Sequence, residues 1–441
     1  MPQLRTRFVK LIPSESEDSD LSSSESGSEG EGVVQDACSV LNEIITNSES
    51  DSDEVKEQPS FSHDQRKGRK KCVWKKGDIS TKRKLLPFTG ADALPEEILT
   101  LTTPLQYFKK LFPESLLQLI VWQSNLYAAQ KHPEKPLKLT EGELEQFMGV
   151  CLWMSLVKAP NARKYWNARY KIECVSEVMG VNRWEEIKNH IHFHDNNDGE
   201  GRDRLQRIRP LINHLREALM TIPKEKALCV DEQIVPFKGR SIMKQYNPRK
   251  PHRWGYKVFV LSGVSGFCYD FEIYTGEQVK IGPSEIDCGA SSNVVIRLCR
   301  TVPSMVGHKL YFDNYFSSID LLVQLESRCI QSTGTVRLNR LPGLPGPSEK
   351  ELKKSGRGAM NECLTNVDGA DIACVRWYDN KMINLVSTFT GAKPIVKVQR
   401  WSKAEHEYKE INCPTIVQEY NKNMGGVDLL DSLLGLYRIK I

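Results

Sequence analysis

The stretch ALCVDEQIVPF (residues 227–237) is a mostly apolar run that carries a carboxylate at Asp231. Runs of Val, Ile, Tyr and Phe bounded by Gly and Pro are typical of strands, and three more follow, at 256–264, 268–276 and 308–316. Two helical patterns lie among them, SSNVVIRLCRTV (291–302) and SSIDLLVQLES (317–327). The order β-β-β-α-β-α predicts an α/β layer structure.

The residues in front of these strands have a helical pattern. Apolar residues recur at helical spacing between residues 94 and 225. Thr103-Pro104 predicts a helix N-terminus, and Thr140 with Glu143 has the spacing of a capping box. We therefore expect a mostly helical region at 89–226. The family resemblance given below implies that this region serves dimerisation and DNA binding.

Residues 1–88 have the composition of a disordered tail. Between Ser14 and Ser60 there are 14 acids and one base, a net charge of 1 − 14 = −13, and the Ser/Glu/Asp/Gly-rich part at 14–32 has almost nothing to bury. Serines beside acids make phosphorylation by acidophilic kinases an expectation. The basic block that follows, Arg66–Lys76 and Lys82–Lys84, predicts a nuclear localisation signal or a DNA-backbone arm; the alternative is a linker that balances the acidic tail.

The residues after 338 divide into two parts. A Gly/Pro/Lys-rich stretch and two strand patterns predict a small β-rich insertion at 339–412. A helical pattern around Gly425-Gly426 then returns at 413–441. We expect the α/β region to consist of residues 227–338 as its first part and 413–441 as its final part.

The composition excludes several classes of protein. The longest apolar stretch, Met148–Val157, is too short to span a bilayer, and the first residues lack the apolar segment of a signal peptide. The 12 cysteines contain no C-x-x-C pair, which argues against a zinc ribbon or a disulfide scaffold and favours reduced thiols in the cytosol or nucleus. The net charge of +5 is compatible with nucleic-acid binding.

Three aspartates stand where carboxylates need a partner. Asp231 and Asp313 follow apolar strand residues, and Asp428 lies at the start of a helix with Asp431 one turn later. If they converge they repel one another, and Mg²⁺ or Mn²⁺ would remove that penalty and support phosphodiester chemistry. Their spacings, 82 and 115 residues, form no local motif. The alternatives are a helix N-cap for Asp428 and turn residues for the other two.

Five strings in order decide between these alternatives: DEQIVPFKGR, YNPRKPHRWGYKVF, LYFDNYFSSIDLL, GTVRLNR and YNKNMGGVDLLD. They closely resemble piggyBac-type DNA transposases and their domesticated relatives, from about Pro95 to the last residue. The resemblance implies a ribonuclease-H-like core with Asp231, Asp313 and Asp428 as its catalytic, metal-binding triad, and Asp431 as an acid beside the third. It further implies cut-and-paste DNA transfer at TTAA sites, a homodimer and a nuclear protein.

The segment KGRSIMKQYNPRKPHRWGYK interleaves basic and aromatic residues directly after the first acid, which suits phosphate contact and base stacking. The alternative is a solvated loop whose Trp254 packs on the core. In the family the insertion lies over the element end, so Trp377 is a second candidate for stacking, although a buried core Trp fits it equally. The residues we expect to contact double-stranded DNA are Lys238, Arg240, Arg249, Lys250, Arg253, Trp254, Lys257, Arg337 and Trp377.

His190, His192 and His194 alternate, as metal ligands on a strand can. They fit a helix C-terminus better, where histidines suit the helix dipole, so no zinc is expected.

Relatives normally continue past LYRIKI with further helices and a Cys/His-rich zinc module. The sequence therefore predicts a C-terminally truncated member whose activity is in doubt. Two other readings stay open: a domesticated, catalytically inactive DNA- or chromatin-binding protein, and a general nuclease of ribonuclease-H type, which would not explain the strings outside the core.

Overall fold

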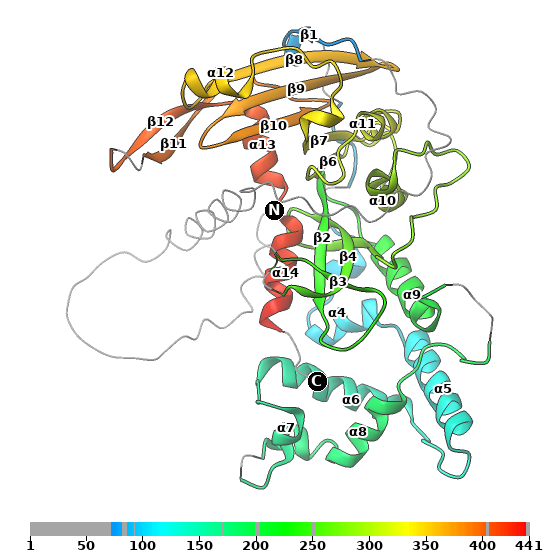
Figure 1. Ribbon diagram of the computed structural model, residues 1–441. Helices are drawn as coiled ribbons and strands as arrows, with labels where there is room; N and C mark the ends of the chain where they lie inside the picture. Colours follow the sequence, from blue (N-terminus) through cyan, green and yellow to red (C-terminus); the bar gives the residue numbers. More distant parts are fainter. Residues whose placement is uncertain are drawn as a thin grey trace, which may run out of the picture. The chain divides into compact units, whose positions relative to one another are not determined.

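The structure is a computed structural model that describes residues 72–81, 86–91, 93–169, 171–198, 203–248, 250, 252–402 and 405–437 (Figure 1). The acidic tail predicted at 14–60 lies outside the described residues, as does Arg249. None of the helices within these ranges is both long and apolar enough to cross a membrane.

The region predicted as helical contains helices and 3-10 turns but no strand among its described residues. The helices are α3 Glu96–Leu99, α4 Pro104–Leu111, α5 Glu114–Lys131, α6 Glu141–Leu156, α7 Glu173–Ser176, α8 Val181–His190 and α9 Arg209–Met220.

Local sequence explains where these helices begin. Thr103 accepts a hydrogen bond from the backbone N–H of Gln106, whose side chain accepts one in return, so α4 starts with a full capping box. Thr140 caps α6 by accepting from the N–H of Glu143. Buried Leu116, Leu144 and Trp184 join α5, α6 and α8 in one apolar core. The predicted helix starts are therefore confirmed.

The strands of the predicted α/β region lie in one large mixed sheet in the order β7-β6-β2-β4-β3, and β5 also pairs with β4. Its first strands are β2 Ala227–Pro236, β3 Lys244–Tyr246, β4 Trp254–Gly263, β5 Cys268–Ile273, β6 Lys309–Phe312 and β7 Gln331–Thr335. The helices α10 Ala290–Cys299 and α11 Ile319–Glu326 lie where the sequence predicts them. β2, β6 and β7 run parallel, whereas β4 runs antiparallel to both β2 and β5.

The remaining elements follow β7 in the chain, apart from β1. They are β8 Met360–Val367, β9 Ala370–Tyr378, β10 Met382–Ser387, β11 Val396–Ser402 and β12 Glu407–Cys413, with α12 Glu349–Lys354, α13 Thr415–Asn423 and α14 Gly426–Leu436. β8, β9 and β10 extend the large sheet, and only β11 and β12 form a separate two-stranded sheet. Most strands of the predicted insertion thus continue the sheet on which the candidate acids lie.

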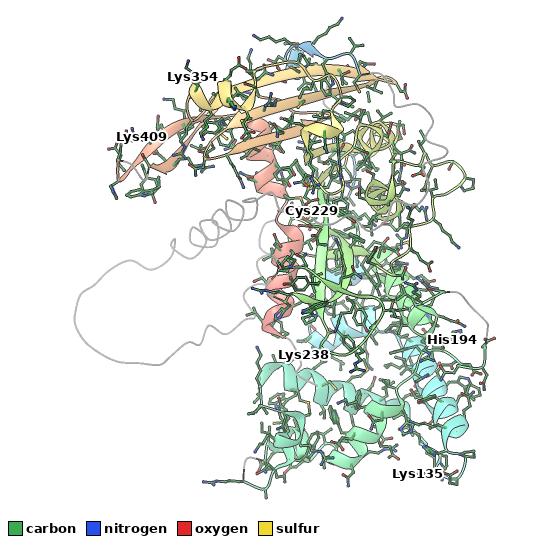
Figure 2. The ribbon with its side chains drawn as sticks, in the orientation of Figure 1. Lys135, His194, Cys229, Lys238, Lys354 and Lys409 are labelled. Atoms are coloured by element: carbon green, nitrogen blue, oxygen red, sulfur yellow. The ribbon has the colours of Figure 1, made fainter. Side chains whose placement is uncertain are left out.

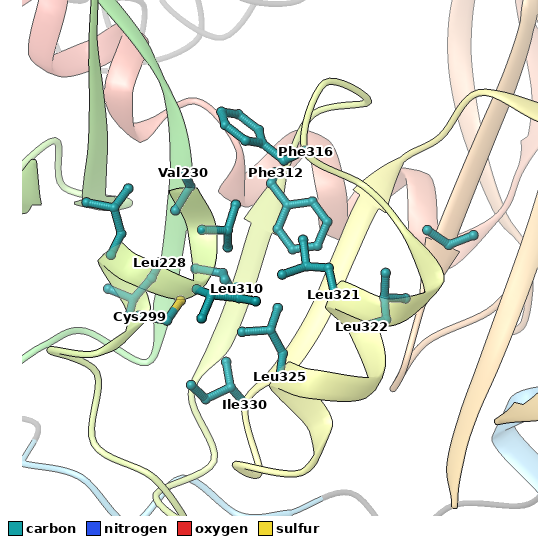
Figure 3. Close-up of a cluster of buried hydrophobic side chains, with 14 of the residues drawn as sticks. Leu228, Val230, Cys299, Leu310, Phe312, Phe316, Leu321, Leu322, Leu325 and Ile330 are labelled. Carbon is teal, nitrogen blue, oxygen red and sulfur yellow. The ribbon is translucent and has the colours of Figure 1, made fainter. Parts of the chain in front are cut away.

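Both faces of the central strands are covered. On one face, Leu228, Val230, Leu310 and Phe312 pack with residues of α10 and α11 (Figure 3). On the other face, Cys229, Val260 and Tyr311 pack with residues of α13 and α14. Figure 1 shows the two helix pairs on opposite sides of the strands. Because successive side chains of a strand point to opposite faces, the odd-numbered side chains of β2 lie on the face that α14 covers.

The prediction of a disordered tail up to residue 88 is wrong for residues 72–81. β1 (Lys75–Lys76) pairs antiparallel with β8, and Trp74, 8% exposed, packs into the core. Ile79, 1% exposed, packs with Leu364. Two apolar anchors inside a basic run hold this segment on the sheet edge, and the high charge of its neighbours masks them in the composition.

Candidate functional site

Asp231 and Asp313 follow paired positions of two neighbouring parallel strands. β2 pairs with β6 from Ala227 opposite Lys309 to Val230 opposite Phe312, always 82 residues apart. Asp231 and Asp313 are also 82 residues apart, so each is the next residue after the last pair. A spacing that forms no sequence motif is therefore the register of the sheet, and it brings the backbones of the two acids to the same level.

Asp428 comes from α14, which packs on the odd-numbered face of β2. Cys229 is fully buried there, and the backbone N–H groups of Gly426 and Val427 face its sulfur. Asp231 and Asp428 both act electrostatically on that thiol and help to raise its pKa, after burial as the main cause. Asp431 lies one turn after Asp428 in α14, and its Oδ1 accepts a hydrogen bond from Nε2 of Gln233 at 3.2 Å. Figure 2 labels Cys229 where β2 meets α14.

The surroundings of Asp313 disfavour its charge. Burial, followed by the Glu232 carboxylate, raises the pKa of Asp313 to about 6, although Lys257 and hydrogen bonds from the N–H groups of Tyr315 and Phe316 act in the opposite direction. Oε2 of Glu232 is buried without a hydrogen-bond partner. Such partly desolvated carboxylates are what a bound cation would stabilise.

The described residues do not form a closed metal cage: no three Asp, Glu, His or Cys side chains among them converge closely enough to hold an ion. Asp231 lies within β2, which continues to Pro236, at the level where β6 ends, and Asp313 directly follows β6. The helix α14, which carries Asp428, packs beside β2. The carboxylate oxygens of these three aspartates are the ligands that Mg²⁺ and Mn²⁺ prefer. Burial is the main cause of the raised pKa of Asp313, and the Glu232 carboxylate adds to it. The donor chemistry fits a divalent cation, while the triad stays an expectation.

The basic segment after Asp231 forms a hairpin, β3–β4, with an aromatic pair on its surface. Tyr246 lies opposite Trp254, their ring centroids are 4.6 Å apart, and they are 50% and 53% exposed. The Nζ of Lys244 lies 5.2 Å from the Trp254 ring centroid. Lys238, labelled in Figure 2, and Arg253 are exposed nearby. An exposed aromatic pair among cations is a surface suited to nucleic acid.

The other predicted DNA contacts differ in exposure. Arg240 is exposed, and Lys250 is half-buried. Lys257 is half-buried, with its Nζ 4.5 Å from the Tyr315 ring centroid. Arg337 donates to the side-chain oxygen of Asn314 at 3.3 Å, next to Asp313. Lys257 and Arg337 therefore adjoin the loop of the second acid.

The stacking role considered for Trp377 is wrong. Trp377 lies in β9, between β8 and β10, and is 1% exposed. Its Nε1 donates to the backbone oxygen of Asn412 at 2.8 Å, so its ring is a core residue that holds β12. An exposed aromatic pair of the insertion is instead Trp401 opposite Tyr408. The alternation in VKVQRWS (396–402) places Trp401 on the same face as Lys397 and Gln399, and could have identified it.

Sequence reasoning missed two residues at this site, Gln233 and Glu232. Both lie in the string DEQ, but an amide and a second acid beside Asp231 carry no local signal of their role. Their contacts with Asp431 and Asp313 depend on elements almost 200 and about 80 residues away along the chain.

Comparisons with known proteins agree with the sequence motifs. The family described as Transposase IS4 matches residues 103–441. The human PiggyBac transposable element-derived protein 3 is 30% identical over an alignment of length 462 that covers 98% of this chain and 76% of that protein. The human PiggyBac transposable element-derived protein 2 is 29% identical over 399 residues, 89% of this chain and 66% of that protein.

A solved structure has the same fold. The cryo-EM structure of the piggyBac transposase synaptic complex with hairpin DNA matches with a TM-score of 0.63, over 79% of this chain and 71% of that chain. The identity is 22%, so this likeness carries the fold alone.

Proposed function

The chain belongs to the family of piggyBac transposable element-derived, transposase-like proteins, and from this premise we propose that it binds DNA and carries a metal-dependent strand-transfer core. The observation that carries the proposal is the common register of Asp231, inside β2, and Asp313, directly after the parallel strand β6, with the Asp428 helix packed beside β2.

The proposed core is ribonuclease-H-like. The order β5-β4-β2-β6-β7, with three antiparallel strands followed by two parallel ones, supports this assignment. Asp231, Asp313 and Asp428 would hold Mg²⁺ or Mn²⁺, which would supply activation of a water or 3′-hydroxyl and stabilisation of the leaving oxygen. Burial and, after it, Glu232 raise the pKa of Asp313, so a bound cation would stabilise its charged form.

DNA would lie on the β3–β4 hairpin. Lys238, Arg240 and Arg253 would contact phosphates, and Trp254 with Tyr246 would stack on bases. Cleavage at TTAA sequences and a nuclear location are further parts of the proposal; they rest on the family resemblance and on the basic block.

A second candidate is DNA binding without cleavage. It is favoured by the lack of convergence of three metal-ligating side chains among the described residues. In that case the β3–β4 hairpin would act alone, and the acids would only maintain the fold.

One experiment separates the two candidates. The purified chain is incubated with a duplex ending in TTAA and with Mg²⁺ or Mn²⁺, beside the variant Asp231→Ala, Asp313→Ala, Asp428→Ala, and the DNA is run on denaturing gels. We expect metal-dependent nicking that the variant lacks. Salt-sensitive binding by both proteins without nicking would replace the enzyme with the binding protein. Absence of binding as well would contradict both.

A further inference from the structure

The N-terminal half of α14, which carries Asp428, is fixed to β2 at two points. At the first, the backbone of Gly426 touches the strands: a Cβ there would lie 2.2 Å from the carbonyl oxygen of Gly263 and 2.8 Å from Sγ of Cys229. No side chain fits at such distances, so glycine is required by the close approach. The second point is the hydrogen bond from Gln233 to Asp431.

Asp231 lies between the two contact positions of β2, and Asp428 lies between the two contact positions of α14. Cys229, Asp231 and Gln233 alternate onto one face of β2, and Asp428 stands between Gly426 and Asp431 in α14. Fixing both ends of this short contact therefore fixes the position of the third acid relative to the first.

Gln233 is suited to this task. It is 8% exposed, so its amide is largely removed from water, and a lost hydrogen bond there is costly. The Nε2 donor also uses a carboxylate oxygen of Asp431 that would otherwise be available to an ion. A positioning contact thus explains Asp431 without making it a ligand.

We propose that Gln233 and Asp431 seat α14 on β2 and hold Asp428 opposite Asp231, so that Asp431 is a positioning residue and not a metal ligand. The consequence for cleavage rests on the proposed function, whereas the seating itself does not. The arrangement predicts that the donor and acceptor can be exchanged, because only the hydrogen bond matters.

Three variants of the whole chain test this exchange. Asp431→Asn keeps an oxygen acceptor for Gln233, so Mn²⁺ affinity, cleavage and amide hydrogen exchange in α14 should change by less than about twofold. Gln233→Glu places two carboxylates together; cleavage and Mn²⁺ affinity should fall about tenfold or more, the range seen for residues that orient metal ligands. Exchange in α14 should accelerate. The double variant Gln233→Glu, Asp431→Asn pairs the new amide at 431 with the new carboxylate at 233, and it should recover most of the lost cleavage and Mn²⁺ affinity.

The outcomes are distinct for a metal ligand. In that case Asp431→Asn alone would weaken Mn²⁺ binding about tenfold or more, and the double variant would not recover it. Either result would overturn the proposal. Gln418→Glu, the same change at an exposed position of α13, is the matched control and should alter nothing.

Two further measurements keep the test decisive. If Gln233→Glu does not fold, Gln233→Met keeps the length of the side chain without a donor and should accelerate exchange in α14 with a smaller loss of Mn²⁺ affinity. If the unmodified chain cleaves no DNA, the proposed function fails, but hydrogen exchange in α14 still decides the seating. Unchanged exchange in both Gln233 variants would refute it.

Discussion

Asp313 and Asp379 each directly follow a strand of the same large sheet, but the charged groups around the two carboxylates differ. Asp379, after β9, is buried and held by two cations: Nε of Arg357 lies 2.7 Å from Oδ1, and Nε of Arg400 lies 3.1 Å from Oδ2. Asp313, after β6, has a second acid, Glu232, as its strongest charged neighbour, and its pKa is raised to about 6. Asp379 is therefore paired with cations of the chain, whereas burial and the Glu232 carboxylate favour the protonated form of Asp313.

The two exposed hairpins repeat this difference. Both present a Trp directly opposite a Tyr, Trp254 with Tyr246 and Trp401 with Tyr408. The β3–β4 pair is surrounded by basic residues, while β11–β12 pairs Lys397 with Glu410 and mixes both signs. Lys409 of the second hairpin is labelled in Figure 2. Similar aromatic surfaces thus differ in the charge around them.

The largest expected effect tests Asp379. Asp379→Ala leaves two arginines facing each other without their shared partner, so the free energy of unfolding should fall by about 3–5 kcal/mol. Urea denaturation measures it. Glu410→Ala removes an exposed ion pair and should cost less than about 1 kcal/mol. Equal losses in the two variants would show that burial does not distinguish these acids.

Asp313 should behave in the opposite way. The folded state raises the pKa of Asp313 above its unfolded value near 3.8, so the folded state holds its proton more tightly. The stability linked to this proton is complete below about pH 4 and is lost as the pH rises through about 6. Asp313→Asn should therefore stabilise the fold at pH 7.5 by up to about 3 kcal/mol, and hardly at pH 4. A gain independent of pH would contradict this cause.

The charges around the two hairpins give the next effect. Lys238→Glu with Arg253→Glu should lower the slope of log affinity against log salt for duplex DNA by about two, because each phosphate contact contributes roughly one. Lys397→Glu with Lys409→Glu makes the same change in charge on the other hairpin and should leave the slope unchanged. Filter binding across a salt series measures both. Equal changes would mean that net charge alone decides binding.

The smallest effect concerns the aromatic rings. Trp254→Ala should weaken single-stranded DNA binding by about 1 kcal/mol, the lower end for base stacking on an aromatic ring. Trp401→Ala should not, since fewer cations hold phosphates beside it. Fluorescence anisotropy with a short oligonucleotide reports both. A larger loss with Trp401→Ala would move the nucleic-acid surface to the insertion.

Much of the fold follows from local sequence patterns. The mostly apolar runs that contain Asp231 and Asp313 predicted β2 and β6, and Thr103 and Thr140 predicted two helix starts, because caps and strand patterns depend on neighbours within a few residues. The five ordered strings also predicted the family, which the comparisons confirm.

The sequence by itself determined which residue types are present and in what local elements: an acid within one strand and another after its neighbour, a basic aromatic hairpin, and a glycine pair at the start of a helix. Only the tertiary structure decided their partners. In the structure, the register of β2 and β6 brings residues that are 82 positions apart next to each other. Trp377 is buried in β9, Trp74 packs against the sheet, and Gln233 forms a hydrogen bond with Asp431. The physical reason is that such contacts depend on pairing and packing between distant segments, whose energies no local pattern records.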